Sequence, residues 1–432
     1  MSLRTALVSR VAEKVTGAAR QQRQRLRAER RRRQASLPHV VDYFHQADDP
    51  YAALMVQVLP AFAARYDVQL RCHLVSTPPD WAAPERERLV NWSRADAAHL
   101  ASRAGLSFTD GGAQPAAERV AHAERLFAKS LHPGTFVADA AAISAALWSG
   151  AALPDASGDP TAAKAEGDAL RSRLGHYLGA TLHYGGEWYW GLDRLHYLEE
   201  RLSSLGVGQT GADAKPIYVQ PQSPAPDASA NLAPSGGAID FFLSFRSPYT
   251  WIAATRVKTL ADAYGLGLRL RFVLPMVMRG LPVPPAKGTY ITLDAAREAR
   301  RNGVPFGRVA DPVGRPVERG YSLLPWAIGQ GRGHEYCVAF MRAVWSEGVD
   351  AGRDAGMRRI VEAAGLDWAV ARQLIGNDGW RAEAEVNRRE LLGLGLWGVP
   401  CFAYNGVSAW GQDRLWVIES AIRSTQSKIS GR

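Results

Sequence analysis

"DFFLSFRSPYTWIAATRV", residues Asp240–Val257, contains a strand, a turn and a helix from which the rest of the fold can be worked out. The apolar run 239–243 has the length and phenylalanine content of a buried strand. Ser247 and Pro248 follow, and serine and proline are favoured at the N-cap and the first position of a helix. The stretch therefore predicts a strand that leads into a helix, and the free N–H groups at the start of this helix attract anions.

A similar pattern occurs earlier in the chain, which indicates an internal repeat. Residues 41–75 align without a gap on residues 239–273, with identity at Asp42, Phe44, Pro50, Tyr51, Tyr66 and Leu70. Near the end of each half, "WGLDRLHYLEERL" at 190–202 parallels "WGQDRLWVIESAI" at 410–422. Each half is thus predicted to be one copy of a strand–helix–strand fold that closes with a turn and a helix.

The second copy has a helical pattern between its second strand and its closing segment. Four segments with this pattern are separated by Gly and Pro, at residues 290–301, 334–345, 356–365 and 368–376. The predicted fold class is therefore α/β, with two tandem domains that each contain a helical insertion.

The length of 432 residues exceeds one ordinary hydrophobic core and favours two domains. The Gly-, Pro-, Ala- and Ser-rich composition of residues 205–237 is typical of a linker. The predicted order is a basic tail at 1–36, a first domain at 37–204, the linker at 205–237, a second domain at 238–425 and a C-terminal tail at 426–432.

Positive charge is concentrated at the N-terminus. Residues 1–35 hold eleven Lys or Arg against two Glu, and so nearly all of the net charge of +10. The nearly neutral remainder argues against a nucleic-acid-binding protein as a whole. Leu3, Leu7, Val11 and Val15 recur every fourth residue, so two interpretations stay open. In the first interpretation, residues 1–35 form a basic amphipathic helix that binds an anionic surface, either membrane or nucleic acid. In the second, they are a solvated, disordered extension. Their Arg-rich composition also resembles a transit peptide.

The apolar segments and the cysteines of the sequence indicate where in the cell the protein is located. No apolar segment approaches the roughly 20 residues that span a bilayer, and no short apolar block near the N-terminus resembles a secretory signal. The odd number and wide spacing of Cys72, Cys337 and Cys401 argue against disulfides and against a thiolate metal site. We expect reduced thiols and a cytoplasmic protein.

Five motifs of the second copy occur in order over residues 238–425. They are "DFFLSFRSPYTWIA", "KGTYITLDAAREARRNGVPF", "AFMRAVWSEG", "GVPCF" and "WGQDRL". With them, this copy resembles the thioredoxin-fold branch of DsbA-like proteins, kappa-class glutathione transferases and 2-hydroxychromene-2-carboxylate isomerases. The resemblance implies a glutathione-dependent isomerase of a small aromatic, unsaturated carbonyl compound. A kappa-type transferase and a non-catalytic tandem module docked by its basic tail are the alternatives.

The resemblance also implies the site residues. Ser247 is the implied catalytic residue, which hydrogen-bonds the sulfur of glutathione, and a hydroxyl donor at a helix N-terminus suits a thiolate. Pro248 and Tyr249 are implied to line the same turn. Val399 is implied to pair its backbone with the tripeptide ahead of a cis Pro400, and the γ-glutamyl end is implied to be held by Asp413 and Arg414.

The branch divides by whether a CxxC pair occupies this turn. Ser247 and Thr250 stand at the two cysteine positions here, which argues against dithiol oxidoreductase activity. Many relatives carry a glutathione-contacting Asn after the second strand, but residues 279–287 contain none. In the first copy, Asp49 aligns with Ser247, and "LGATL" at 178–182 aligns with "GVPCF". We therefore predict that the first copy keeps the fold without the chemistry.

Further candidates have structural and functional interpretations that the sequence leaves open. His45, His73 and His183 fall on neighbouring predicted strands, but their spacing matches no ligand pattern, and no metal site is predicted. Cys401, next to Pro400, is either a small buried strand residue or a nucleophile. The residues that either line an apolar pocket or pack in the core are Met276, Met278, Tyr290, Trp326 and Trp397.

Overall fold

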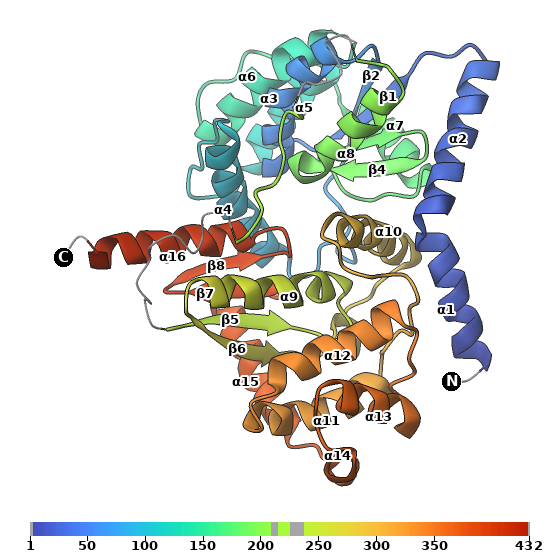
Figure 1. Cartoon of the computed structure of the whole chain (residues 1–432). Coiled ribbons are helices and arrows are strands. Elements are labelled where there is room, and N and C mark those ends of the chain that lie inside the picture. Colours follow the sequence, from blue (N-terminus) through green and yellow to red (C-terminus); the bar gives the residue numbers. More distant parts are fainter. Residues whose placement is uncertain (1–2, 133, 209–214, 225–236, 431–432) are drawn as a thin grey trace. The chain divides into compact units, whose positions relative to one another are not determined.

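The computed structural model describes residues 3–132, 134–208, 215–224 and 237–430. The chain divides into two compact units (Figure 1). The first unit is Gln22–Gln220, and the second unit consists of the residues up to Gln21 together with Pro221–Arg432. Each unit contains one copy of the repeat.

The first unit is built on a four-stranded sheet with the order β2-β1-β3-β4. Its strands are β1 (Val40–His45), β2 (Gln69–Leu74), β3 (Thr181–Tyr184) and β4 (Glu187–Trp190). Its helices are α3 (Pro50–Arg65), α4 (Arg86–Ala104), α5 (Ala117–Lys129), α6 (Thr135–Ser149), α7 (Thr161–Arg173) and α8 (Gly191–Ser204), and most of α2 (Ala18–Gln34) also belongs to it. The pair β1–β2 is parallel, and β1–β3 and β3–β4 are antiparallel.

The second unit repeats this sheet in the order β6-β5-β7-β8. Its strands are β5 (Ala238–Leu243), β6 (Gly267–Phe272), β7 (Cys401–Tyr404) and β8 (Val407–Trp410). Its helices are α1 (Leu3–Thr16), α9 (Pro248–Ala263), η1 (Met276–Arg279), α10 (Pro285–Arg301), α11 (Arg315–Gly329), α12 (Gly333–Ser346), α13 (Asp354–Ala363), α14 (Trp368–Leu374), α15 (Trp380–Gly393) and α16 (Leu415–Ser430). Helix α9 packs on β5 and β6, and α16 packs on β7 and β8.

The strand register confirms the repeat alignment. Asp42 on β1 is paired with His183, and its counterpart Asp240 on β5 is paired with Ala403. Trp190 is paired with Thr181 in the first unit, as Trp410 is paired with Cys401 in the second. Because the same positions are paired in both sheets, the fold class is confirmed as α/β, with two tandem thioredoxin-like domains.

Two polar contacts also recur in both copies. The hydroxyl of Tyr51 donates to Asp96 at 2.8 Å, and that of Tyr249 donates to Asp294 at 2.8 Å. The second contact joins a tyrosine at the end of the first helix to a glutamate of the closing helix, and the pairs are Tyr66–Glu199 and Tyr264–Glu419. The alignment therefore extends into the helical insertion and the closing helix.

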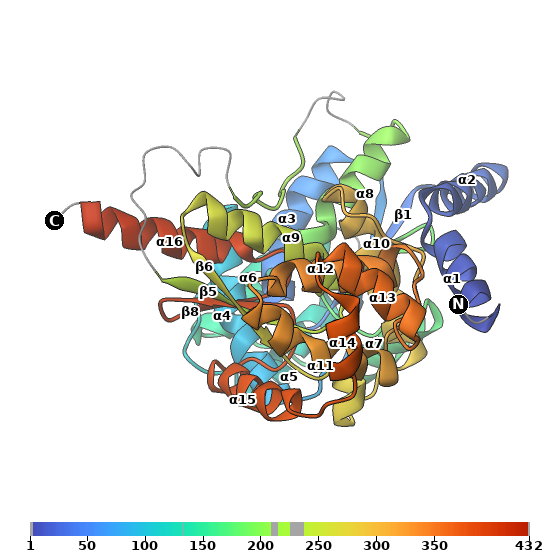
Figure 2. The same cartoon turned by 60° about the horizontal axis from the view of Figure 1, so that its bottom comes forward.

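The helical insertion of the second unit is larger than the sequence predicted. The four predicted segments correspond to α10, α12, α13 and α14, and α11–α14 are grouped together in the second unit (Figures 1 and 2). The sequence interpretation missed α11 and α15. Pro325 lies inside α11, and proline in the interior of a segment normally argues against a helix.

The N-terminal residues, for which a helix and a disordered extension were both open, form the helices α1 and α2. Arg25 on α2 makes a bidentate pair with Glu187 on β4, with both N–O distances 2.7 Å. Of the predicted linker, residues 209–214 and 225–236 lie outside the described residues. Within residues 215–220, Ile217 N donates to Glu199 at 2.9 Å, so this part of the linker is bound to the first unit.

No helix in the described part of the chain is both long and apolar enough to cross a membrane.

The predicted C-terminal tail is helical as far as the structure describes it, because residues 426–430 continue α16.

The core of the second unit depends on a close approach at Gly320 in α11. Phe245, which follows β5, stacks on Phe340 of α12 with ring centroids 4.2 Å apart. A Cβ atom added to Gly320 would lie 2.5 Å from Phe340 and 3.0 Å from Phe245. The absence of a side chain at Gly320 therefore lets α11 reach this aromatic pair.

Gly320→Ala is expected to destabilise the protein by about 1–3 kcal/mol, because a methyl group would overpack the Phe245–Phe340 contact. Urea unfolding of the full chain measures this difference. Gly329→Ala in the same helix is the matched control, because nothing lies within 4 Å of its added Cβ. The control should be neutral or stabilising by up to about 1 kcal/mol. Equal losses for both variants would contradict the packing argument.

Candidate functional site

Ser247 joins the start of α9 to a distant turn of the second unit. Its extended backbone and its side chain cap α9, since Oγ accepts a hydrogen bond from Thr250 N at 3.2 Å. The same hydroxyl donates to Val399 O at 3.2 Å. Serine serves both contacts because a hydroxyl accepts and donates at once. Two of the predicted site residues are thereby in direct contact.

The Val399–Pro400 peptide bond is cis, as the family resemblance implies. Pro400 stands immediately before β7, and its carbonyl accepts a hydrogen bond from Gly411 N at 2.9 Å. This bond brings the turn after β8 next to the turn before β7. Asp413 and Arg414 follow Gly411 by two and three residues, so the same bond brings their turn close to the cis proline.

Asp413 and Arg414 follow a glycine that the turn requires. Gly411 has φ +114°, and a Cβ atom on it would lie 2.6 Å from Asp413 Oδ1. Arg414 is buried, with its Nη1 3.6 Å from Asp413 Oδ1. The turn therefore presents a carboxylate supported by a buried guanidinium, an arrangement suited to an ammonium group.

The remaining predicted site residues lie in the first turn of α9. Pro248 is buried at the first helical position. The hydroxyl of Tyr249 donates to Asp294 on α10, and Arg297 donates to the other carboxylate oxygen at 2.6 Å. The hydroxyl of Tyr249 is thus engaged within the protein, which limits this residue to contacts through its ring.

Sequence reasoning missed two groups of polar residues beside these turns. Arg279 Nη2 donates to Trp397 O at 3.1 Å, two residues before Val399. Arg256, Gln412 and Glu298 form a hydrogen-bonded chain that ends at the residue before Asp413. The available signal was the difference between "WGLDR" and "WGQDR", which puts an amide at an otherwise aliphatic position.

Cys401 is held as a thiol. It is fully buried, its Sγ–H donates to Gly398 O at 3.0 Å, and burial raises the pKa of the thiol well above its ordinary value. Because the thiolate is the reactive form, these surroundings favour the structural interpretation over the nucleophilic one.

Most of the residues considered for an apolar pocket pack within the protein. Met278 and Trp326 lie against the hydrophobic core of the second unit. Trp397 is buried and meets Trp410 edge to face, with centroids 5.0 Å apart. Met276 and Tyr290 are partly exposed.

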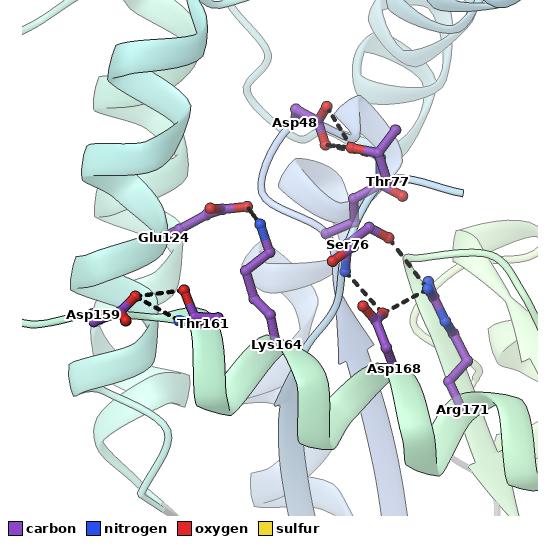
Figure 3. Close-up of polar contacts among 10 residues, drawn as sticks. Asp48, Ser76, Thr77, Glu124, Asp159, Thr161, Lys164, Asp168 and Arg171 are labelled. Atoms are coloured by element: carbon purple, nitrogen blue, oxygen red, sulfur yellow. Dashed lines mark hydrogen bonds and ion pairs between the residues drawn. The ribbon is translucent and has the colours of Figure 1, made fainter. Parts of the chain in front are cut away.

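The corresponding turn of the first copy is filled by its own side chains. Asp49 caps α3 through Tyr51 N at 2.9 Å. Gln46 Nε2 and Thr77 Oγ1 donate to the carboxylate of Asp48, the latter visible in Figure 3. A Cβ atom on Gly179, which aligns with Val399, would lie 2.5 Å from Gln46 Cβ and 3.4 Å from Asp49 Oδ2. Asp48 and Asp49 at this turn of the first copy thus accept hydrogen bonds from within the protein.

Helix α7 closes the same region of the first copy. Asp168 Oδ1 accepts from Ser76 N at 3.0 Å and from Arg171 at 2.7 Å, and Lys164 pairs with Glu124 at 2.6 Å (Figure 3). These contacts fix α7 against the end of β2 and against α5. They are interactions within the protein and point to a structural role.

The first unit also has an open cavity of about 530 Å³. Its lining residues are Arg86, Glu87, Val90, Asn91, Arg94, Gly112, Ala113 and Gln114. The two arginines are paired with Asp80 at 2.8 Å and with Asp110 at 3.0 Å. Their charge is therefore already compensated.

Of the three histidines on the first sheet, His73 and His183 lie beside one carboxylate, whereas His45 contacts Tyr43. His73 Nε2 is 2.9 Å from Asp42, and His183 Nδ1 is 3.9 Å from the same carboxylate. Burial would raise the pKa of Asp42, but the hydrogen bonds from His183 and His73 together lower it. His45 is buried and meets the hydroxyl of Tyr43 at 3.1 Å. Among the described residues, no cluster of His, Cys, Asp or Glu is arranged to hold a metal ion.

Comparison with named proteins gives one family. Residues 238–423 match the family model described as DSBA-like thioredoxin domain. The 2-hydroxychromene-2-carboxylate isomerase of Pseudomonas putida is 24% identical over 192 residues, covering 43% of this chain and 93% of the relative. The protein of the same name from Sphingobium xenophagum is 23% identical over 198 residues, covering 42% and 96%.

The chain is also similar to solved structures. A structure of 2-hydroxychromene-2-carboxylate isomerase is matched with a TM-score of 0.40 and 22% identity, covering 45% of this chain and 99% of that chain. The cytosolic disulfide reductase DsbM from Pseudomonas aeruginosa with GSH is matched with a TM-score of 0.34 and 19% identity, covering 45% and 98%. The family model spans nearly all of the second copy, so residues 238–423 of this chain are similar to the DSBA-like thioredoxin domain.

Proposed function

We propose that the second unit is a glutathione-dependent isomerase that acts on a small aromatic, unsaturated carbonyl compound. The hydrogen bond between Ser247 and Val399 carries the proposal, because it brings a neutral hydroxyl at a helix N-terminus next to a cis proline. The named isomerases that this chain resembles support the choice of reaction.

The donor set fits glutathione by its chemistry. Ser247 has one hydroxyl proton, which it donates to Val399 O, and on glutathione binding this proton would turn to the thiolate, with the N-terminal dipole of α9 behind it. The backbone of Val399 would pair with the tripeptide, and Pro248 and Pro400 would shape the two turns that hold it. Asp413 and Arg414 would hold the γ-glutamyl end, because a carboxylate pairs with an α-ammonium and a guanidinium with a carboxylate.

When bound, glutathione supplies a thiolate that adds reversibly to a conjugated double bond, which rotates as a single bond until the thiolate leaves. Ser247 orients and stabilises the thiolate by hydrogen bonding. The hydroxyls of Ser247 and Thr250, in place of two thiols, favour chemistry without net oxidation or reduction. The free thiols of Cys72, Cys337 and Cys401 are consistent with a cytoplasmic location.

A kappa-type transferase would use the same residues and differs only in keeping the adduct. Product analysis distinguishes the two. An isomerised chromene acid with no glutathione consumed supports the isomerase, and a stable adduct with an electrophile supports the transferase.

Ser247→Ala is expected to weaken glutathione binding about tenfold and to raise the pKa of the bound thiol, because one hydrogen bond to sulfur is lost. Calorimetry gives the affinity, and the ultraviolet absorbance of the thiolate against pH gives the pKa. Ser247→Thr keeps the hydroxyl and should keep both properties. No binding by the unmodified protein would refute the enzyme proposal, whereas unchanged binding by Ser247→Ala would remove only the role of Ser247.

We further propose that the first copy keeps the fold without this chemistry. Burial raises the pKa of Asp49 to about 7, assisted by the charge of Asp48 and opposed by the N–H groups of Tyr51 and Ala52. A group that binds its proton more tightly when folded stabilises the fold at low pH. This contribution is lost as pH rises from the ordinary aspartate value towards 7.

Asp49→Asn removes this titration and keeps the oxygen that caps α3. The free energy of unfolding of the variant minus that of the unmodified protein should therefore be larger at pH 8 than at pH 5, by at least about 1 kcal/mol. Guanidinium unfolding of the full chain at both pH values measures the gain. A stability difference that is independent of pH would show that Asp49 does not titrate in this range.

A further inference from the structure

A polar network of two buried residues and one partly buried arginine lies beside the Trp410–Arg414 turn. Arg256 Nη1, on α9, donates to the carbonyl of Gln412 at 2.8 Å and to its Oε1 at 2.7 Å. Gln412 Nε2 donates to Glu298 Oε2, on α10, at 2.6 Å. Gln412 and Glu298 are 2% and 1% exposed. The network thus ties two helices to the residue that precedes Asp413.

The first copy contains no polar side chain at any of these positions. The repeat alignment, supported by the Tyr–Asp contacts and by the strand register, gives the aliphatic counterparts of the three residues. Val58, Leu100 and Leu192 correspond to Arg256, Glu298 and Gln412, and all three are buried. The same architecture is therefore built once with a charged network and once with aliphatic packing.

Stability does not account for the network. Buried charges lose their hydration, and their replacement by apolar residues of similar volume is often neutral or stabilising. Burial lowers the pKa of Arg256, and the nearby charges of Asp413 and Glu298 only oppose this effect. The copy that retains the costly network is also the copy that has Ser247 and the cis Pro400.

We infer that Arg256, Gln412 and Glu298 are positioning residues that fix Asp413 for the α-ammonium group of a γ-glutamyl ligand, an inference that rests on the proposed function. Arg256 holds the carbonyl of the Gln412–Asp413 peptide, so this peptide cannot rotate without breaking a partly buried charged hydrogen bond. Glu298 in turn holds the amide of Gln412 in the orientation that Arg256 requires.

The test is the triple variant Arg256→Val, Glu298→Leu, Gln412→Leu, which gives the second copy the side chains of the first. It is expected to stay folded, with an unfolding temperature near that of the unmodified protein. Calorimetry compares glutathione with cysteinylglycine, which lacks the γ-glutamyl group. The unmodified protein should prefer glutathione, and the variant should lose about tenfold of this preference while its affinity for cysteinylglycine is unchanged.

Arg319→Met is the matched control, because Arg319 is another largely buried arginine of the second unit, paired with Asp354. Its preference for glutathione should be unchanged. An unchanged preference in the triple variant would overturn the positioning role alone, whereas no glutathione binding by the unmodified protein would overturn the proposed function and this inference together. If the triple variant does not fold, Gln412→Leu alone must show the loss of preference, and an unchanged preference there overturns the inference.

An independent observation concerns the orientation of α1. Ser9 and Thr16 face the second unit and are buried, and Arg300 donates to Thr16 O at 2.8 Å. The aliphatic residues instead face outward: Leu7, Val8 and Val11 are 66%, 55% and 52% exposed. A helix docked by its hydroxyl face leaves its apolar face to be covered by something else.

We propose that this outer face of α1 binds an anionic lipid surface. Arg10 and Lys14 are exposed on the same helix, so cations flank the aliphatic residues. This combination fits a bilayer interface, where apolar side chains enter the acyl boundary and cations meet anionic headgroups. Nucleic acid would use the cations and leave the aliphatic residues in water.

Sedimentation of the full chain with vesicles tests this second proposal. Binding is expected to phosphatidylglycerol-containing vesicles and not to pure phosphatidylcholine. The variant Leu7→Ser, Val8→Ser, Val11→Ser should bind at least about tenfold more weakly. Val370→Ser with Val386→Ser, which changes exposed aliphatic residues on α14 and α15, is the matched control and should bind as before. No binding, equal binding to both lipids, an unaffected triple variant or tighter binding to duplex DNA would each overturn the proposal.

Discussion

The hydrogen bond from Ser247 Oγ to Val399 O connects the start of α9 with the turn before β7, across 152 residues of sequence. Its donor is also the cap of α9, so one hydroxyl fixes both turns of the site. A carboxylate at this position caps the helix equally well but cannot donate while ionised. The first copy shows this difference, because Asp49 caps α3 and the neighbouring turn is packed against Gln46.

The two copies serve as an internal comparison of fold and chemistry. What they share holds the sheet and helices together: the strand register, the Tyr–Asp contacts and the Tyr–Glu contacts. What differs gathers around one turn region, where the second copy has Ser247, Pro400 and Gln412 and the first has Asp49, Ala180 and Leu192. Ala180 takes a left-handed backbone with φ +51° in place of the proline. The two copies therefore differ mainly in the turns where the proposed ligand would bind, and they share the architecture of the sheet and helices.

Charge is used in two ways at the N-terminus. Arg25 is engaged by Glu187, and Arg32 by Glu29, so part of the basic sequence serves structure. Arg23, Arg27, Arg30 and Arg31 are exposed on α2, and Arg10 and Lys14 on α1. The amino-acid composition gives only the sum of these positive charges and does not distinguish paired cations from exposed ones. Only their orientation on the helices separates those that stabilise the protein from those that are free to meet a partner.

The sequence by itself determined the strands, α9, the repeat and the family motifs, because these depend on local periodicity and on capping residues such as Ser247. It did not predict α11, since Pro325 breaks the local pattern and the helix is held by tertiary packing of Tyr321 and Leu324 in the core. Only the tertiary structure decided that Ser247 meets Val399, that Arg256, Gln412 and Glu298 form one network, and that α1 turns its aliphatic face outward. These features join residues far apart in sequence, or depend on which face of a helix is docked, and periodicity contains neither kind of information.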